Sequence, residues 1–354
     1  MTPNKTARKG ILLMNLGSPD STRVPDVKRY LDEFLMDKRV IDYPYLFRWL
    51  LVRGIITPSR SPKSAEAYEK VWWPEGSPLI VLTERLKKAL EPLAGMAVET
   101  AMRYGNPSTE TGFTRLMERV KGLEEVLAFP LYPHYAMSSY ETAAAHVRKV
   151  HEKANYPFKL TVMRPFYDDP GYISALAERI SPFLERPYDY LLFSYHGVPE
   201  RHIRKGDVTG HHCLQRADCC SVHSPAHQYC YRHQIITTME LTARALALPR
   251  EKYGFSFQSR LGKDPWLKPY SVQVLEEMPS KGIKKLLVAC PAFVADCLET
   301  LEEMAMQGRE IFMKAGGESF ELIPCLNDHP AWVNVLAGWV EAYEAGSTSM
   351  VSAM

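Results

Sequence analysis

The sequence predicts an α/β fold in two similar lobes, each built on a doubly wound parallel sheet. Three observations carry this prediction. The 354 residues suffice for about two domains. Short apolar runs alternate with stretches of helical periodicity, which is typical of βαβ units. A six-residue segment near residue 17 is echoed near residue 197, which favours two related halves.

The predicted elements follow one another in a regular order. The apolar runs that predict strands are 10–14, 126–129, 160–163, 190–193, 255–257, 285–289 and 320–323. The stretches that predict helices between them are 25–36, 78–93, 113–121, 140–153, 172–184 and 235–247. Hydrophobic residues make up 46% of the chain and charged residues 24%, which is enough apolar material for real cores and excludes disorder of the main body.

Charge and motifs exclude several function classes. The formal net charge is only +2, which argues against a nucleic-acid binder that depends on bulk positive charge. No GxGxxG follows a predicted strand and no GxxxxGK[ST] is present, so dinucleotide and P-loop chemistry lack support. No signal peptide follows the start, and Arg48 and Arg53 interrupt the most apolar segment, 43–56. We therefore expect a cytoplasmic protein whose seven cysteines are thiols or metal ligands.

In doubly wound folds, ligands bind beyond the carboxyl ends of the strands. The echoed segments, NLGSPD and YHGVPE, lie at such ends, with their glycines at 17 and 197. His196 directly follows the run YLLFSY, where an imidazole can act as a base or bind a divalent metal. A histidine that only caps the strand end is the alternative, and position alone does not separate the two.

Two carboxylates follow the run 285–289. Asp296 and Glu299 have the spacing of a capping box at a helix start, which is the simpler interpretation. Glu299 and Glu303 would lie one turn apart on one face, where like charges repel. Such a pair at a strand end is more readily explained if it binds a cation or transfers protons.

The segment 211–233 is rich in metal-ligand types, with Cys213, Cys219, Cys220 and Cys230. The paired CxxC of zinc ribbons is absent. Four thiolates in one loop suit a [2Fe–2S] centre, which we favour over zinc and over thiols that bind nothing.

Aromatic and basic residues after other strands suggest a flat apolar pocket that also offers a cation for acidic groups. They are Trp266 in QSRLGKDPW, Arg103 and Tyr104 in AMRYGNP, and Tyr132 in FPLYPHY. Each taken singly is more often a packing residue.

Together these segments form an ordered series of motifs: NLGSP, EGSPL, MRYGNP, the YPHY stretch, FSYHGVPERH, FQSRLGKDPW and CPAFVADCLETLEE. In types and order they match the ferrochelatases, which insert ferrous iron into protoporphyrin IX as the last step of haem biosynthesis. The chain resembles this family from about residue 10 to residue 340.

The resemblance implies two Rossmann-like lobes with a porphyrin cleft between them, and a lyase that takes protoporphyrin IX and ferrous iron. His196 would face the pyrrole nitrogens, with Glu299 opposite it. These two would hold the Fe²⁺ substrate, and Glu303 would continue an acidic path for metal or protons. The implied substrate contacts are Trp266, Phe293, Tyr132, Ser18, Tyr104 and Arg103, the last of them for a propionate.

The chain also departs from the family pattern. Cys297 stands where many members have histidine, which removes that histidine from proton handling. No cysteine follows Cys325, so the C-terminal cluster ligands of animal members are absent. The insertion at about 207–233 instead resembles the internal cluster of some bacterial members. Cys290 is left out of the implied ligand set, as is Cys297.

The predicted organisation has an N-terminal lobe at 9–170 and a C-terminal lobe at 171–328. A helix at 329–345 should pack back on the first lobe, and a disordered tail should cover 346–354. The apolar segment 43–51 is either a buried helix or a mobile lip that admits substrate or touches the membrane surface peripherally. Alternatives to this function are a cobalt or nickel chelatase for another tetrapyrrole and a non-catalytic haem or iron–sulfur carrier.

Overall fold

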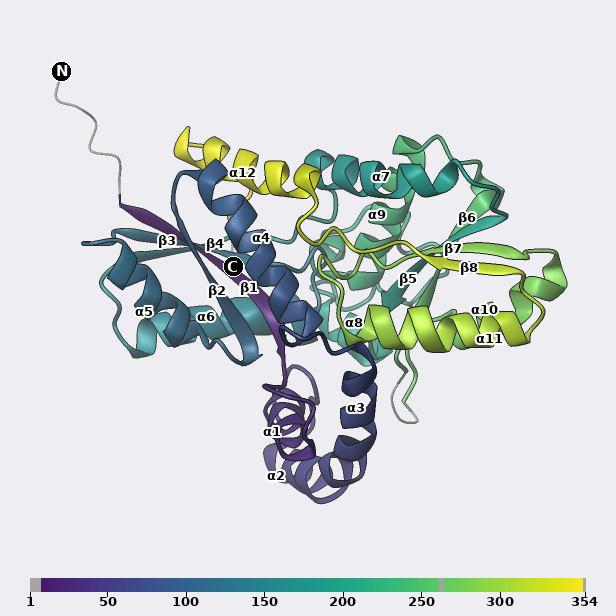
Figure 1. Ribbon diagram of the computed structural model, residues 1–354, viewed down its shortest axis with the longest axis horizontal. Coiled ribbons are helices and arrows are strands. Elements are labelled where there is room, and N and C mark those ends of the chain that lie inside the picture. Colours follow the sequence, from purple (N-terminus) through teal and green to yellow (C-terminus); the bar gives the residue numbers. More distant parts are fainter. Residues whose placement is uncertain (1–7, 261–263, 353–354) are drawn as a thin grey trace. The chain divides into compact units, whose positions relative to one another are not determined.

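In the computed structural model, which describes residues 8–260 and 264–352, parallel strands form two four-stranded sheets (Figure 1). The first sheet contains β1 (Lys9–Ser18), β2 (Ala97–Gly105), β3 (Glu125–Pro130) and β4 (Lys159–Val162). The second contains β5 (Tyr190–His196), β6 (Tyr253–Gln258), β7 (Lys285–Ala289) and β8 (Ser319–Leu322). The predicted α/β class with two parallel sheets is confirmed.

The two sheets have the same strand order. The first is ordered β2-β1-β3-β4 and the second β6-β5-β7-β8, so β1 and β5 occupy equivalent central positions. Their centres are fully buried, from Ile11 to Met14 in β1 and through Leu191 and Phe193 in β5. Such continuous apolar strands are expected where helices cover both faces of a parallel sheet.

Helices connect the strands throughout. They are α1 (Val24–Leu35), α2 (Tyr45–Trp49), η1 (Leu50–Ile56), α3 (Thr57–Val71), α4 (Pro78–Ala94), α5 (Thr109–Arg119), η2 (Met137–Glu141), α6 (Thr142–Lys153), α7 (Pro170–Leu184), α8 (Glu200–Gly206), η3 (Pro225–Tyr229), α9 (Tyr231–Ala245), η4 (Arg250–Lys252), α10 (Ser271–Glu277), η5 (Met278–Lys281), η6 (Glu299–Gly308), α11 (Arg309–Lys314) and α12 (Pro330–Glu344). Local sequence explains several starts, since Asp169 caps α7 by accepting from Tyr172 N at 3.1 Å.

The chain divides into two compact units, one around each sheet. The first contains the described residues 8–131, 138–165 and 333–352, and the second contains 132–137 and the described part of 166–332. The residues of α12 from Val333 onward belong to the first unit. There the Tyr343 hydroxyl donates to Glu125 at 2.7 Å, and Lys9 Nζ lies 2.5 Å from Glu344.

Strand β2 is missing from the apolar runs because its middle carries charge. Glu99 is 3% exposed, yet its carboxylate pairs with Lys87 Nζ at 2.6 Å and Arg119 Nη1 at 2.7 Å. Pairing makes burial of the carboxylate tolerable, and the strand therefore forms in spite of its mixed sequence.

The end of the chain is more ordered than the sequence suggests. Met350 is buried, Val351 forms an antiparallel bridge with Met163, and Ser352 N donates to Val162 O at 2.8 Å. The predicted disordered tail is therefore wrong for these residues, because backbone hydrogen bonds beside β4 hold them. Residues 353–354 lie outside the described part of the chain. In the described residues, none of the helices has the length and apolar character to cross a membrane.

Candidate active site

His196 is the last residue of β5, at the carboxyl end of the second sheet's central strand. Its Nδ1 lies 2.6 Å from the carbonyl oxygen of Gly197. Because a carbonyl only accepts, Nδ1 carries the proton, and Nε2 of the neutral ring keeps its lone pair. The imidazole is half-buried. It can therefore accept a proton or bind a metal through Nε2.

Glycine at the next position avoids tight contacts that a side chain would make. Gly197 N donates to Gln258 O at 2.8 Å, and a Cβ at position 197 would come within 3.0 Å of that oxygen and 3.1 Å of the Trp266 ring. Gly17, the last residue but one of β1, is the glycine of the echoed segment in the first unit, and a Cβ there would meet Tyr104 O at 1.8 Å. The echoed glycines thus serve close approach to the neighbouring strand in both units.

Two predicted pocket aromatics lie around the imidazole. The Trp266 ring centroid is 6.4 Å from that of His196, and the Phe293 centroid is 6.5 Å away in an edge-on arrangement. Trp266 is 9% exposed and Phe293 is half-buried. The second unit therefore brings three of the predicted site residues together and places apolar surface beside the basic nitrogen.

Glu299 and Glu303 lie on η6, a ten-residue π-helix rather than the α-helix with a capping box that the sequence favours. Asp296 does not pair with Glu299. Its carboxylate accepts from Thr300 Oγ1 at 2.9 Å and from Asn327 Nδ2 at 2.7 Å, which ties the helix start to the loop after β8. A π-helix is rare and is often found at functional sites.

The environment of Glu303 raises the pKa of its carboxyl. Burial is the largest effect and raises the pKa of this carboxyl, and repulsion from Glu299 adds to it. A hydrogen bond from Ser259 Oγ and attraction to His196 act in the opposite direction. Ser259 has φ +68°, in the left-handed region that is costly for a residue with a side chain. Backbone strain therefore accompanies the contact with Glu303.

Gln258 is a site residue that the sequence reasoning missed. Its backbone oxygen receives Gly197 N–H, its side-chain oxygen accepts from Ser194 Oγ at 2.7 Å, and its amide nitrogen donates to Glu299 O at 2.9 Å. A polar residue at the end of the apolar run YGFSF was the available signal. The hydrogen bonds of Gln258 link the backbones next to His196 and at Glu299.

The Cys297 thiol contacts the carboxylate of Glu299. Burial raises the pKa of the Cys297 thiol well above its usual value, and the charge of Glu299 and a hydrogen bond to it add to the increase. The thiol is thus a neutral donor to Glu299. It does not offer the ionisable group that histidine would.

Two further predicted contacts, Arg103 and Tyr104, belong to the first unit. Arg103 pairs with Asp37, donates from Nε to Thr142 Oγ1 at 2.8 Å and lies 4.2 Å from the centre of the Tyr104 ring. The Tyr104 hydroxyl also donates to Asp37 at 3.1 Å. Asp37 was not anticipated from the sequence. The contact of Arg103 with a propionate stays a prediction.

Ser18 and Tyr132 are both buried. Ser18 ends β1 in the first unit, and its hydroxyl has no hydrogen-bond partner among the described residues. Tyr132 follows β3 but belongs to the second unit. Their roles toward substrate stay predictions.

The four cysteines of the insertion lie near one another in the second unit. The sulfurs of Cys219 and Cys220 are 4.0 Å apart. A hydrogen bond with Cys213 is the largest cause that raises the pKa of Cys230 to about 12, and a hydrogen bond with Cys230 raises the pKa of Cys220 further still. Among the residues that the structure describes, no three or more His, Cys, Asp or Glu side chains are grouped as ligands of a metal ion.

Polar contacts hold the backbone that carries these thiols. His212 and His227 both approach Cys219 O through Nε2, at 2.6 and 2.9 Å, and Arg232 Nη1 lies 3.1 Å from the sulfur of Cys220. Asp207 accepts from Cys213 N at 2.7 Å. A cationic donor and a fixed backbone are features that suit anionic sulfur ligands.

Comparison with known proteins agrees with the motifs. The family model described as Ferrochelatase matches residues 8–344. A ferrochelatase of Opitutus terrae is 48% identical over 338 residues, covering 95% of this chain and 97% of that protein. A ferrochelatase of Pseudomonas paraeruginosa is 50% identical, covering 92% of this chain and 96% of that protein.

A solved structure shares the fold. SirB from Bacillus subtilis, solved with Fe³⁺, has a TM-score of 0.53 and 12% identity, with 96% of each chain covered. At this identity the likeness concerns the fold alone.

Proposed function

The chain belongs to the ferrochelatase family, and from that premise we propose that it inserts ferrous iron into protoporphyrin IX to form protohaem. Two N–H bonds of the porphyrin break, the iron binds the nitrogens, and two protons leave. Metal–porphyrin formation of this kind is a lyase reaction. Among alternatives, cobalt or nickel insertion and a carrier role have no observation in their favour.

One observation carries this proposal: the Nδ1–H of His196 is committed to Gly197 O, 2.6 Å away, which leaves Nε2 as the basic atom. Nε2 accepts a pyrrole proton, for which an imidazole is suited near neutral pH. Trp266 and Phe293 flank the ring and offer apolar surface to a macrocycle.

The carboxylates of η6 take the other part of the reaction. Glu299 and His196 hold the incoming Fe²⁺ substrate, because carboxylate and imidazole are both good ligands for it. The single Nε2 lone pair serves one partner at a time, so His196 accepts a proton only after the iron has left it. Glu303 accepts protons released from the porphyrin, since burial raises the pKa of its carboxyl towards the working range of a base. Gln258 keeps the backbone of Glu299 fixed relative to the residues next to His196.

We also propose that Cys213, Cys219, Cys220 and Cys230 hold a [2Fe–2S] cluster. The linked thiols and the nearby Arg232 fit an anionic cluster, whose two irons each need only a pair of these ligands. When bound, the cluster supplies cross-links that order the segment. Because the unliganded thiols of Cys220 and Cys230 have raised pKa values, cluster binding would release protons.

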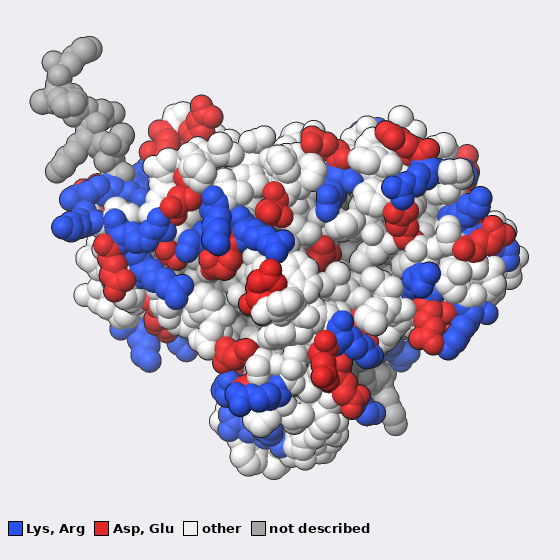
Figure 2. Space-filling model, viewed as in Figure 1, with Lys and Arg blue, Asp and Glu red and all other residues white. Residues whose placement is uncertain are grey.

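The protein is further proposed to act in the cytoplasm with a peripheral membrane contact. Large apolar side chains are exposed along α2 and η1, including Leu46 at 69% and Ile55 at 65%. Figure 2 shows mainly uncharged surface on the helical segment that Figure 1 labels α2, with Lys and Arg near it. This composition suits adsorption to an anionic lipid surface.

An anaerobic assay tests the proposed reaction. Purified protein is mixed with protoporphyrin IX and Fe²⁺, and the porphyrin absorption is followed, with Co²⁺ and Ni²⁺ in parallel. We expect turnover with iron, and loss of about 10²-fold or more in kcat for His196→Ala with porphyrin binding retained. His223→Ala, which changes an exposed histidine, is the control. Porphyrin binding without turnover would overturn the enzyme in favour of a carrier, and faster insertion of cobalt or nickel would overturn the substrate metal.

A further inference from the structure

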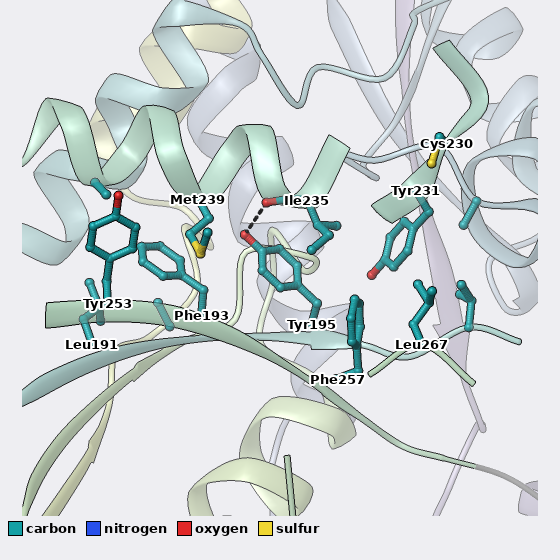
Figure 3. Packing of buried hydrophobic residues seen from close by; sticks show 14 of the residues in the cluster. Leu191, Phe193, Tyr195, Cys230, Tyr231, Ile235, Met239, Tyr253, Phe257 and Leu267 are labelled. Atoms are coloured by element: carbon teal, nitrogen blue, oxygen red, sulfur yellow. Dashed lines mark hydrogen bonds between the residues drawn. The ribbon is translucent and has the colours of Figure 1, made fainter. Parts of the chain in front are cut away.

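The Cys-rich segment, residues 211–233, is joined to the strand that carries His196 by one buried side chain. Tyr231 directly follows Cys230, is the first residue of α9 and is 5% exposed. Its hydroxyl donates to the backbone oxygen of His196 at 2.9 Å. In Figure 3 the Tyr231 ring extends from the start of α9 towards the strands, near Leu267 and Phe257.

The peptide group between His196 and Gly197 is thereby held at both polar atoms. Tyr231 donates to its carbonyl, and its N–H donates to Gln258 O at 2.8 Å. The carbonyl of the next residue, Gly197, receives the Nδ1–H of His196 at 2.6 Å. Rotation of the His196–Gly197 peptide group would also move the Gly197 carbonyl. The imidazole therefore keeps its direction and tautomer only while this peptide group stays fixed.

The position of Tyr231 depends in turn on the segment. Cys230 O accepts the Gln234 N–H at 3.1 Å in the first turn of α9. The Gln234 side chain donates to His227 O at 3.2 Å and to Gln228 O at 2.8 Å, and it accepts from Tyr135 N at 2.6 Å. The start of α9 is therefore fastened to residues 227–230 and moves with them.

The Tyr231 ring itself has little freedom. It lies edge-on to the ring of His134, with 5.9 Å between centroids and an interplanar angle of 89°. His134 is held by Thr238 at 2.9 Å. A rigid ring delivers its hydroxyl to one place, so a shift at Cys230 is transmitted to the His196 carbonyl.

We propose that Tyr231 is a positioning residue through which the Cys-rich segment sets the orientation of the His196 imidazole. This inference rests on the proposed role of His196 as the proton acceptor. It gives the segment a role in catalysis that needs no electron transfer and no contact with substrate.

The test is Tyr231→Phe, with Tyr253→Phe as the matched control. Tyr253 is equally buried in the same core and loses a hydrogen bond of 2.7 Å to Glu240, at the other end of the cluster in Figure 3. We expect Tyr231→Phe to lower kcat about tenfold or more while KM for protoporphyrin IX stays within about twofold, since only orientation is lost. Tyr253→Phe should lower the melting temperature without a change in kcat.

A second measurement reports on the imidazole directly. Nitrogen NMR of histidine-labelled protein should show His196 protonated at Nδ1 in the wild type and in Tyr253→Phe, and a mixture of tautomers in Tyr231→Phe. Protein made free of iron by chelation should show the same mixture. The tautomer mixture of iron-free Tyr231→Phe protein should then differ little from that of iron-free wild type.

The outcomes separate this inference from the function on which it rests. Unchanged kcat and an unchanged tautomer in Tyr231→Phe would overturn the positioning role. If the wild-type protein never turns over and Tyr231→Phe nevertheless changes the His196 tautomer, the proposed reaction is overturned and the link between the segment and the imidazole stands. If Tyr231→Phe does not fold, wild-type protein with and without the proposed cluster is compared in the absence of added Fe²⁺, and an unchanged His196 tautomer there would overturn the link between segment and imidazole.

Discussion

The side-chain amide of Gln258 donates a hydrogen bond of 2.9 Å to the backbone carbonyl of Glu299. Glu299 opens a π-helix, in which hydrogen bonds join residues five positions apart, and this contact holds the first carbonyl of the helix. The same residue accepts the N–H that follows His196. One buried residue thus contacts the backbone next to a proposed base through its own backbone oxygen and the backbone of a proposed metal ligand through its side chain.

We expect Gln258→Met to lower kcat by about tenfold to a hundredfold, because the volume is kept while the side-chain hydrogen bond that holds the Glu299 backbone beside strand β6 is lost. The unfilled hydrogen bonds at Ser194 and Glu299 should also cost about 1–3 kcal/mol in the free energy of unfolding. Steady-state kinetics and urea unfolding measure the two effects. The exposed Gln273→Met is the control, and equal kinetics in both variants would contradict the linking role.

Asp37→Asn should destabilise the first unit by about 3 kcal/mol, because it leaves the Arg103 guanidinium buried without its carboxylate. Arg103 and Asp37 are 13% and 6% exposed, so solvent does not replace the partner. Denaturant unfolding measures this. Asp20→Asn, which breaks a more exposed pair with Arg29, should cost less than about 1 kcal/mol, and a similar cost in both would speak against the buried pair.

His134 should make the protein sensitive to acid. Full burial lowers the pKa of this imidazole to about 3, against about 6.5 in the unfolded chain. Unfolding therefore takes up a proton, and the free energy of unfolding falls as pH drops from about 6.5 towards 3, by up to about 1.4 kcal/mol per pH unit. His134→Gln keeps a donor for Thr238 and should remove about one proton from the uptake measured on unfolding between pH 6 and 4. An unchanged uptake would show that His134 is not the group responsible.

Cys219→Ser should remove the visible absorption of the proposed cluster, lower bound iron and reduce the melting temperature. The segment is short of apolar residues, so we expect the cluster to stabilise its fold. Cys325→Ser, at another buried thiol, should keep the absorption. Loss of colour with an unchanged melting temperature would contradict the stabilising role, and retained colour would remove Cys219 from the ligand set.

Binding to anionic lipid vesicles should depend on the exposed apolar side chains of α2 and η1. Leu46→Asp combined with Leu50→Asp should weaken co-sedimentation by about tenfold or more. Both side chains are exposed in the protein, and their burial in lipid would stabilise the bound state by several kcal/mol. Leu93→Asp, which changes an exposed leucine on α4, should have little effect. Equal binding by all three proteins would contradict a membrane surface at α2 and η1.

Periodicity and strand ends predict most of the fold and the position of His196. The apolar runs find seven of the strands because burial on both faces demands continuous apolar sequence. They miss β2, where Glu99 is tolerated through pairing with Lys87 and Arg119, partners distant in sequence. The π-helix at Glu299 is invisible to a pattern that assumes α-helical spacing.

Residues that act through other residues are the hardest to predict. Gln258 lies in the motif FQSRLGKDPW without a role predicted for it, Asp37 lies in none of the named motifs, and the contacts of both depend on tertiary structure. The exposed α2 is a different case. Its sequence is compatible with a buried helix or a surface lip, and only the exposure of Leu46 and its neighbours separates the two.

The repeated strand order lets the two halves be compared position by position. Where the second half has His196 before its glycine, the first has Leu16 before Gly17. Both glycines keep the tight approach to the neighbouring strand, whereas a basic side chain is found in one copy alone. If the halves descend from a common ancestor, the backbone corner is the older inheritance, and acid–base chemistry is a later specialisation of one daughter copy.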